Sequence, residues 1–563
     1  MKTLFVNAGE QESWEEKIEN GGIKGILDLG IYLHTEKYKS YMHDVFSPKN
    51  ALIVGAGPFN LPGTQRASFV FRSPIHGALH SSTMGDFGEY IKRTGYLAIC
   101  FEGKAEGSVF VAIRHDKVEF FDAELQEDIF NAEKELYSKL KEFYDSFPFR
   151  ICLCGLGAKY TRYGCLVSSK PGKIGIIPDI AGRGGAGSVL YRAHGIVGFA
   201  VGGKEEVEIL QNSEIVKQQI EATKKYREFG TFKANYPHLK EKTIFANWQS
   251  VYFSPEKRME VFSKYILEML LKDYSFSTET CGERCVAACK KYENSIKIDY
   301  EPMHGMGPFI GIYKREYVRE LVHMIDSFGI DAIYAGAVLG TVFEALWQGE
   351  IKKEEFSLTQ TPCMNAERPE SEINYTVAKE LLTKICKGEC NVLGENLRRI
   401  AKAFDISHLA FYLPCGKEFD MTPNFYWSLG LFLPVAMHGK YFTDYHTVVK
   451  EPEEYAQTCA KRCVVEYLLD NLGICRFHRG WAEKMLLENG YGEIAKQWIS
   501  KLLHFKKLAN VQPVFWESKR TFDVVIALFR EFGEGAWKNV DETAAKEYWK
   551  RWSKEYFSIF ESL

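Results

Sequence analysis

Three cysteines at four-residue intervals, Cys281, Cys285 and Cys289, are the residues whose type and spacing most clearly permit redox chemistry. A fourth, Cys475, ends the sequence Asp-Asn-Leu-Gly-Ile-Cys far downstream. Four thiolates are what a cubic iron–sulfur cluster needs, because sulfur is soft enough for iron and each iron takes one anionic protein ligand. If the 281–289 segment is helical, positions i, i+4 and i+8 share a face and the three thiols can point at one object. The sequence therefore predicts a four-iron, four-sulfur (4Fe–4S) cluster.

Two other interpretations of these cysteines stay open. Cysteine also behaves as a small buried hydrophobe, so a triplet at helical spacing can be one face of an amphipathic helix. A structural zinc site also takes four thiolates, but zinc sites usually use tighter pairs such as C-x2-C. The C-x3-C-x3-C spacing of this chain favours iron over both.

A second motif occurs twice, as Asp326-Ser-Phe-Gly-Ile-Asp331 and as Asp470-Asn-Leu-Gly-Ile-Cys475. Each copy follows an amphipathic helical stretch, and taken alone each is a helix ending in which Gly adopts the left-handed conformation. The repetition, with a cysteine of the expected cluster at the end of one copy, indicates a pseudo-symmetric pair of ligand contacts. An Asp carboxylate accepts two parallel N–H bonds, which suits an aminopyrimidine edge, and Gly lets the backbone approach closely.

Hydrophobic periodicity changes at about residue 203. Before it, short β-branched and aromatic segments broken by Gly and Pro predict strands at 50–55, 67–71, 96–102, 109–114 and 196–201. After it, the pattern predicts helices, for example at 205–226, 255–272 and 314–327, with a strand-like, proline-marked break at 406–423. We therefore expect an α+β protein with a β-rich base domain at 1–203 and two mainly helical domains at 204–400 and 401–563.

Composition excludes several classes of protein. With 563 residues and 46% apolar content the chain can bury large cores, and its formal charge of -3 gives no overall attraction to nucleic acid. The acidic start offers no readable signal peptide, and no apolar run reaches the roughly 18 residues of a membrane span. The 14 cysteines are scattered, as reduced thiols are. We expect a cytoplasmic protein that binds neither nucleic acid nor membrane.

Five further segments, in order along the chain, resemble the tungsten-containing aldehyde:ferredoxin oxidoreductase family, and the resemblance covers nearly the whole chain. They are 21–25 (GGIKG), 47–58 (SPKNALIVGAGP), 66–77 (RASFVFRSPIHG), 85–95 (GDFGEYIKRTG) and 181–187 (AGRGGAG). The resemblance implies a β-rich base domain under two helical domains, in agreement with the periodicity. It also implies two pyranopterin dithiolenes that hold one tungsten, or molybdenum, between them.

The segment Gly182-Arg-Gly-Gly-Ala-Gly187 formally matches the G-x-G-x-x-G of dinucleotide-binding folds. Only eight residues separate it from the next strand-like stretch at Ile196, too few for a crossover helix, which argues against a dinucleotide. The resemblance implies instead that this backbone cradles a pterin phosphate, with a Mg²⁺ ion bridging the pterin phosphates as a further expectation. The implied contacts are Arg66, Ser82, Gly85, Arg183, Gly184, Gly185 and Ala186.

The resemblance also assigns the two motifs described first. It gives one pterin to Asp326, Gly329 and Asp331, the other to Asp470 and Gly473, and the 4Fe–4S cluster to Cys281, Cys285, Cys289 and Cys475. The chain departs from the family in two places. The family's triplet is C-x2-C-x3-C, one residue shorter than here, and Ser82 and Met84 stand where the family often has Asn and Gly.

The implied reaction oxidises an aldehyde to a carboxylate and passes its electrons singly through the cluster to a ferredoxin or an iron–sulfur partner subunit. Glu301 stands where the family has a glutamate that activates water or moves a proton. The family's catalytic histidine has no clear counterpart, which leaves His304, His438 and His446 as candidates. A homodimer and a hetero-oligomer are both compatible with the sequence.

Three other functions stay open on the sequence. One is the reduction of an aromatic or enoyl-CoA thioester at low potential on the same scaffold, as in the related tungsten subunits of benzoyl-CoA reductases. The others are an electron-transfer subunit with a cluster and no pterin metal, and a zinc-stabilised scaffold. Metal content separates the last two from an enzyme, because the carrier would hold iron alone and the scaffold zinc alone.

Overall fold

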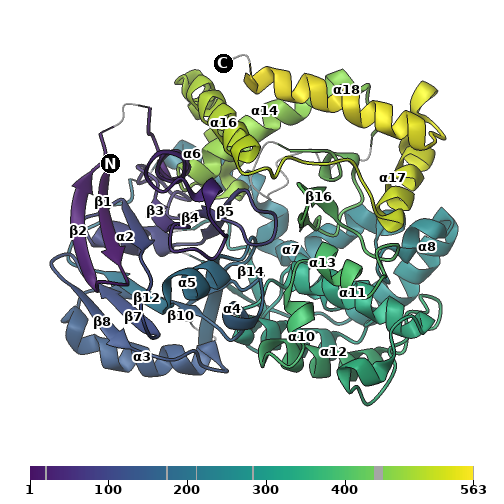
Figure 1. Cartoon of the computed structure of the whole chain (residues 1–563), viewed down its shortest axis with the longest axis horizontal. Coiled ribbons are helices and arrows are strands. Elements are labelled where there is room, and N and C mark those ends of the chain that lie inside the picture. The colour runs from purple at the N-terminus through teal and green to yellow at the C-terminus, as the bar shows by residue number, and fades with distance from the viewer. Residues whose placement is uncertain (20–21, 173–174, 211, 282–284, 436–447, 562–563) are drawn as a thin grey trace.

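The computed structural model describes residues 1–19, 22–172, 175–210, 212–281, 285–435 and 448–561. Most strands gather in the N-terminal third of the chain, and helices make up most of the rest (Figure 1). This arrangement confirms the expected α+β class, with a β-rich base followed by mainly helical structure. Within the described ranges, no helix is both long and apolar enough to cross a bilayer.

Residues 2–102 build a six-stranded sheet in the order β2-β1-β6-β3-β4-β5. All neighbours in it are antiparallel except β1 and β6. Strand β3 is buried along its whole length, so its sequence, LIVGA, is a continuous apolar run instead of an alternating one. The strands are β1 (Lys2–Asn7), β2 (Glu12–Lys17), β3 (Leu52–Ala56), β4 (Ala67–Arg72), β5 (Leu79–Met84) and β6 (Ala98–Glu102).

Residues 109–202 build the same sheet a second time, in the order β8-β7-β12-β9-β10-β11. Again one pair is parallel, β7 with β12, which corresponds to β1 with β6. The strands are β7 (Val109–Ile113), β8 (Val118–Asp122), β9 (Phe149–Cys154), β10 (Leu166–Gly172), β11 (Gly175–Ala181) and β12 (Ile196–Gly202). The base is therefore two copies of one supersecondary unit.

Helices occupy equivalent places in the two copies. Helices α1 (Ile26–Tyr32) and α3 (Ile129–Tyr144) each follow the first hairpin, and α2 (Phe87–Arg93) and α5 (Ala186–His194) each precede the last strand. The sheets share one apolar core, in which Phe101 of the first copy and Phe199 of the second lie 4.8 Å apart between ring centroids.

Helix α5 corrects one expectation. A nine-residue helix does fill the space between the glycine motif and β12, because it begins inside the motif, at Ala186. The sheet topology nevertheless differs from that of a dinucleotide-binding fold. Strands β11 and β12 lie at separate places in the sheet and run antiparallel, so β11, α5 and β12 do not form the parallel unit of that fold.

The expected helices after residue 203 are present. The 205–226 stretch contains α6 and the start of α7, the 255–272 stretch contains α8 and a following π-helical turn, and 314–327 is α10. Two short strands, β16 (Leu413–Cys415) and β17 (Phe419–Met421), lie in the expected break. The helices used below are α6 (Ser213–Ala222), α7 (Lys224–Leu239), α9 (Tyr300–Gly305), α10 (Arg315–Phe328), α11 (Ala332–Gln348), α14 (Pro452–Asn471), α15 (Arg479–Glu488) and α18 (Glu542–Glu561).

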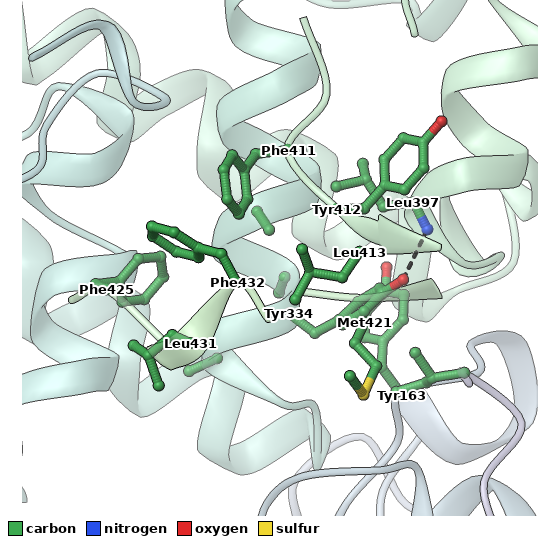
Figure 2. Close-up of a cluster of buried hydrophobic side chains, with 14 of the residues drawn as sticks. Tyr163, Tyr334, Leu397, Phe411, Tyr412, Leu413, Met421, Phe425, Leu431 and Phe432 are labelled. Carbon is green, nitrogen blue, oxygen red and sulfur yellow. Dashed lines mark hydrogen bonds between the residues drawn. The ribbon is translucent and has the colours of Figure 1, made fainter. Parts of the chain in front are cut away.

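The predicted division near residue 400 falls inside a continuous apolar core. Figure 2 shows Tyr334 of α11 among side chains from the 411–432 region, including Leu413 and Met421. The Tyr334 hydroxyl donates to Asp420 at 2.8 Å and accepts from the Leu397 backbone N–H at 2.7 Å. Packing therefore joins the two helical parts, and their separation into domains stays a prediction.

Candidate functional site

The first D-x-x-G motif ends helix α10 against the second copy of the base unit. Gly329 has a left-handed φ of 65°, as expected for a residue that terminates a helix. Its carbonyl accepts the N–H of Cys165 at 2.8 Å, just before β10. A Cβ on Gly155, just after β9, would lie 2.2 Å from the carbonyl oxygen of Phe328, so only glycine permits this approach.

The second D-x-x-G motif ends helix α14 against the first copy in the same way. Gly473 also has a φ of 65°, and its carbonyl accepts the N–H of Arg66 at 3.2 Å, just before β4. A Cβ on Gly57, just after β3, would lie 1.7 Å from the carbonyl oxygen of Leu472. Gly57 thus corresponds to Gly155, and Leu472 to Phe328. The duplication predicted for the two motifs extends to the sheets that hold them.

The two motif aspartates are buried but differ in their partners. Asp326 makes no hydrogen bond through its carboxylate within the described part of the chain, and burial raises its pKa to about 6. Asp470 accepts the Ser81 hydroxyl at 2.7 Å. Asp331 caps helix α11 through the N–H of Ile333 at 2.9 Å. A buried carboxylate without a donor is what a ligand with paired N–H groups would satisfy.

Three of the four predicted cluster cysteines, Cys281, Cys289 and Cys475, line one cavity of about 780 Å³. The pKa of the Cys289 thiol is raised by burial and by the neighbouring charges of Cys281 and Cys475. The pKa of Cys285 is lowered, chiefly by its hydrogen bond with Cys281, although the charge of Cys475 acts on it in the opposite sense. Thiols from two distant segments therefore interact electrostatically across one space.

The described residues of the cysteine triplet, Cys281 and 285–289, are not in a helix, so the helical geometry considered for their spacing is not observed there. The described part of the segment consists of bends and turns, with a left-handed φ of 43° at Ala288. Among the described residues, no group of three or more His, Cys, Asp or Glu side chains is placed to hold one metal ion. The ligands of a cluster stand farther apart than those of a single zinc, so three cysteines lining a roomy cavity, with Cys285 hydrogen-bonded to Cys281, fit a cluster.

Glu301, in α9, lines the same cavity. The Tyr426 hydroxyl donates to its Oε1 at 3.2 Å, and the side-chain amide of Asn235 donates to the Tyr426 oxygen at 3.1 Å. Burial raises the pKa of Glu301 above its ordinary value, the charge of Asp299 adds to this, and the Tyr426 hydrogen bond opposes it. Glu301 is thus a carboxylate with a raised proton affinity at a cavity wall, a property that suits a proton-transfer group.

Of the three histidine candidates, the one that the structure describes, His304, does not line this cavity. His304 is fully buried beside Tyr300 and Phe425, accepts or donates a 3.0 Å hydrogen bond with Tyr236, and has its pKa lowered to about 3 by burial. It therefore stays neutral in the core. His438 and His446 lie outside the described residues. No histidine is among the described residues that line the cavity.

The glycine-rich segment begins helix α5 with two left-handed residues, Gly184 (φ 86°) and Gly185 (φ 87°), followed by Ala186. A Cβ on Gly184 would come within 2.3 Å of the His80 ring. Arg183 does not point freely into a phosphate site, because its guanidinium donates to Asp331 at 3.2 Å and to the Thr422 carbonyl at 2.6 Å. The backbone fits an anion cradle, while Arg183 also ties it to α11.

The remaining predicted contacts, Arg66, Ser82 and Gly85, belong to the first copy of the base. Arg66 and Gly85 line the cavity, and the Arg66 Nε is buried without an acceptor among the described residues. A Cβ on Gly85 would lie 1.8 Å from Asp179 and 2.8 Å from the Cβ of Cys281. Ser82 is buried in β5.

Sequence reasoning missed four contributors to the site. Ser81, not Ser82, hydrogen-bonds Asp470, and strand alternation puts these neighbours on opposite faces without saying which face is which. Tyr426 contacts Glu301, and Asn235 contacts Tyr426, each from a separate segment. No sequence motif predicts either residue. Asp179, which forms a 3.2 Å ion pair with Lys290, lies in a strand that was not predicted.

A duplicated β base that seats two helix ends, with three cysteines from two distant segments and a perturbed glutamate lining one cavity, fits a cofactor-dependent redox protein. Family models identify which one. The N-terminal domain of aldehyde ferredoxin oxidoreductase matches residues 3–203, and domains 2 and 3 of the same family match residues 208–560. The chain belongs to the aldehyde ferredoxin oxidoreductase family and is an oxidoreductase of that type.

Individual relatives agree. The chain is 33% identical to the glyceraldehyde-3-phosphate:ferredoxin oxidoreductase of Pyrococcus furiosus, over 91% of this chain and 92% of that protein. It is 26% identical to the tungsten-containing aldehyde ferredoxin oxidoreductase of Pyrococcus horikoshii, over 72% of this chain and 67% of that protein. The fold resembles the BamBC active-site complex of benzoyl coenzyme A reductase in complex with 1,5-dienoyl-CoA, with a TM-score of 0.65, 15% identity, and 98% and 97% of the two chains covered.

Family membership implies a tungsten–pterin cofactor, and the residues present fit such a group. The fit rests on two glycine-lined seats at equivalent places, the buried Asp326 carboxylate without a donor, and the buried Arg66 Nε without an acceptor. The Asp326 carboxylate and the Arg66 Nε are buried polar groups that the described protein atoms leave without a hydrogen-bond partner.

Proposed function

We propose that the chain oxidises an aldehyde to a carboxylate at a tungsten, or molybdenum, bis-pyranopterin, and passes the electrons through a 4Fe–4S cluster to a ferredoxin or an iron–sulfur partner subunit. The balance is R–CHO + H₂O → R–COO⁻ + 3 H⁺ + 2 e⁻. The observation that carries the proposal is the equivalence of the two D-x-x-G seats, together with a cavity lined by Cys281, Cys289, Cys475 and Glu301.

The residues divide the work as follows. Asp326 and Asp470 would bind one pterin each, the backbone at Gly184 and Gly185 would hold phosphate, and a Mg²⁺ ion would supply further charge neutralisation there. When bound, the pterin metal supplies the oxygen transfer and accepts the two electrons. Glu301 takes a proton at its Oε atoms, and the Tyr426 hydroxyl fixes the orientation of that carboxylate.

The four cysteines hold the cluster through which the electrons leave. Cys475 follows directly from the second D-x-x-G motif, so the segment that seats one pterin also supplies a cluster ligand. A short covalent connection of this kind favours electron passage, because it fixes the two groups relative to each other. We propose His438 and His446 as the remaining candidates for a second proton-transfer group, since His304 does not line the cavity.

A dye-linked assay tests the function. Anaerobically purified protein is given glyceraldehyde 3-phosphate, which the Pyrococcus furiosus relative is named for, and unphosphorylated aldehydes, with benzyl viologen as acceptor. We expect reduction of the dye with at least one aldehyde. Reduction of an aryl- or enoyl-CoA by reduced viologen, with no aldehyde oxidation, would contradict the proposal and support the thioester reductase.

A further inference from the structure

Three arginines converge on one buried glutamate beside the cluster site. The Glu466 side chain, on α14, is 2% exposed and forms ion pairs with Arg462 at 2.8 Å, with Arg476 at 3.2 Å, and with Arg479. Counted over these four side chains alone, three guanidiniums and one carboxylate carry a formal charge of +2. Because the guanidiniums are anchored on a buried partner, their positions are fixed before anything binds.

These arginines stand at the mouth of the cavity that holds the cysteines. All three line it, together with Cys475. Their side chains are 27% to 33% exposed. Two exposed residues, Ala222 of α6 and Gly480 of α15, line the same cavity. Helices α6 and α15 contact each other there. The cavity therefore opens to solvent between exposed residues and arginines.

The neighbouring sequence adds further positive charge around the three arginines. The segments 221–227, 461–466 and 476–484, which carry the arginines and the exposed residues of the mouth, contain eight Lys or Arg and three Glu. The whole chain carries -3. A local positive region on a chain of opposite overall charge steers an acidic partner to that region, with an effect that falls as salt screens it.

We propose that the arginine mouth, defined by Arg462, Arg476 and Arg479 on Glu466, docks a small acidic electron-carrier protein. This inference rests on the proposed function for the source of the electrons. The cluster that Cys281, Cys285, Cys289 and Cys475 would hold would give one electron to an oxidised carrier in each encounter, so two carriers would remove the pair. Charge complementarity suits such a partner, because redox encounters use small, transient interfaces whose rate depends on electrostatics.

The double variant Arg462→Gln/Arg479→Gln tests the docking, since it removes two of the three charges and leaves Arg476 on Glu466. We expect KM for an acidic 4Fe–4S ferredoxin to rise about 5- to 20-fold at low ionic strength, with aldehyde oxidation by benzyl viologen unchanged. The rise should shrink as NaCl approaches about 0.3 M, because screening weakens the wild-type attraction. The matched control is Arg551→Gln, whose arginine pairs with Glu453 near the start of the same helix, α14.

Binding of oxidised ferredoxin to the purified holoprotein, measured without turnover by titration at low and high salt, makes the result independent of aldehyde oxidation. Unchanged ferredoxin affinity in the double variant would overturn the inference. So would a higher KM for glyceraldehyde 3-phosphate with the dye as acceptor, which would show that the arginines bind a substrate phosphate. Absence of any dye-linked activity in the wild type would instead count against the proposed function, while the titration still decides the docking.

Discussion

The Tyr426 hydroxyl donates a 3.2 Å hydrogen bond to Glu301, across a sequence separation of 125 residues. Asn235 supports this contact from a third segment, by donating to the tyrosine oxygen at 3.1 Å. Because the amide occupies the tyrosine as an acceptor, the hydroxyl proton is directed at the carboxylate. The contact favours the ionised form of Glu301 and partly offsets the burial that raises its pKa.

Replacing Tyr426 by Phe should therefore raise the pKa of Glu301 further. If ionised Glu301 is the base, the acid limb of the kcat/KM profile moves to higher pH, and the activity on the alkaline plateau changes little. The profile with benzyl viologen measures this. Tyr300→Phe is the matched control, since the Tyr300 ring packs on Tyr426 at 5.2 Å but its hydroxyl donates to the Phe425 carbonyl. Equal pH profiles of kcat/KM for the two variants would show that the Tyr426 hydroxyl does not adjust the pKa of Glu301.

Glu301→Gln should lower kcat about 10²- to 10⁴-fold, the usual contribution of a positioned acid or base. The tungsten and iron contents should stay at wild-type levels, because Glu301 is assigned to no cofactor. Metal analysis together with the dye-linked rate distinguishes this outcome from a folding defect. Full activity of the variant would transfer the proton role to another group.

The two glycines that admit the D-x-x-G carbonyls provide a symmetric test. An Ala methyl would meet backbone oxygen at 1.7 Å in Gly57→Ala and at 2.2 Å in Gly155→Ala, and backbone cannot move aside as a side chain can. Each variant should lose about 1–3 kcal/mol in the free energy of unfolding and a large part of its pterin. Gly107→Ala is the control, because nothing lies within 4 Å of its Cβ. Pterin retained by both variants would contradict the paired seats.

How far the sequence predicts this protein depends on the element. The strands at 67–71 and 109–114 were predicted because their buried sequences are dense in β-branched and aromatic residues. Strand β2, with the sequence ESWEEK, and β11, which contains Pro178, carry no such signal, so the duplication of the base stayed hidden. The sequence does show the two D-x-x-G motifs, but their seats at Gly57 and Gly155 follow only from tertiary packing.

The same limit applies to the site. The cysteine spacing indicated a shared ligand. The described residues of the triplet, however, lie in bends and turns, and the left-handed φ of Ala288 interrupts any helix there. His304 looked available three residues after Glu301, but its neighbours in the fold are Tyr236, Tyr300 and Phe425, which bury it. The sequence shows which residue types could take part in chemistry. The face of the fold on which they lie depends on packing partners far along the chain.

Asp326→Asn should stabilise the cofactor-free chain at neutral pH. The folded-state pKa of Asp326, about 6, lies above its ordinary 3.8, so the folded state binds the proton more tightly and that advantage is lost as pH rises from about 4 to 6. Above pH 7 the buried charge costs about 2–3 kcal/mol, which Asn avoids. Urea unfolding of the metal-free variant at pH 7.5 and pH 4 measures this, and the holoprotein should lose pterin.

Asp420→Asn is the control for that effect. The pKa of Asp420 is also raised to about 6 by burial, but its carboxylate accepts both the Tyr334 hydroxyl at 2.8 Å and the Arg398 N–H at 2.9 Å. An amide supplies one acceptor oxygen instead of two, so this variant should be destabilised. An equal change in the free energy of unfolding in the two variants would contradict the claim that the Asp326 carboxylate lacks a protein donor and binds a ligand.

Cys289→Ser should remove the cluster. Iron should fall from about four per chain toward zero, the brown colour should be lost, and electron transfer to ferredoxin should stop. Cys363→Ser is the control, because Cys363 is not among the residues that line the cavity and its thiol donates to the Arg368 carbonyl at 3.8 Å. A full complement of iron in Cys289→Ser would show that the cluster has other ligands.

The composition of the anaerobically purified wild-type chain tests the central claim most directly. Elemental analysis, pterin quantification and electron paramagnetic resonance of one dithionite-reduced sample give the contents together. The account predicts about one tungsten or molybdenum, two pterins and roughly four irons per chain, with the signal of one reduced 4Fe–4S cluster. Iron without pterin metal, or zinc with no paramagnetic signal, would contradict it.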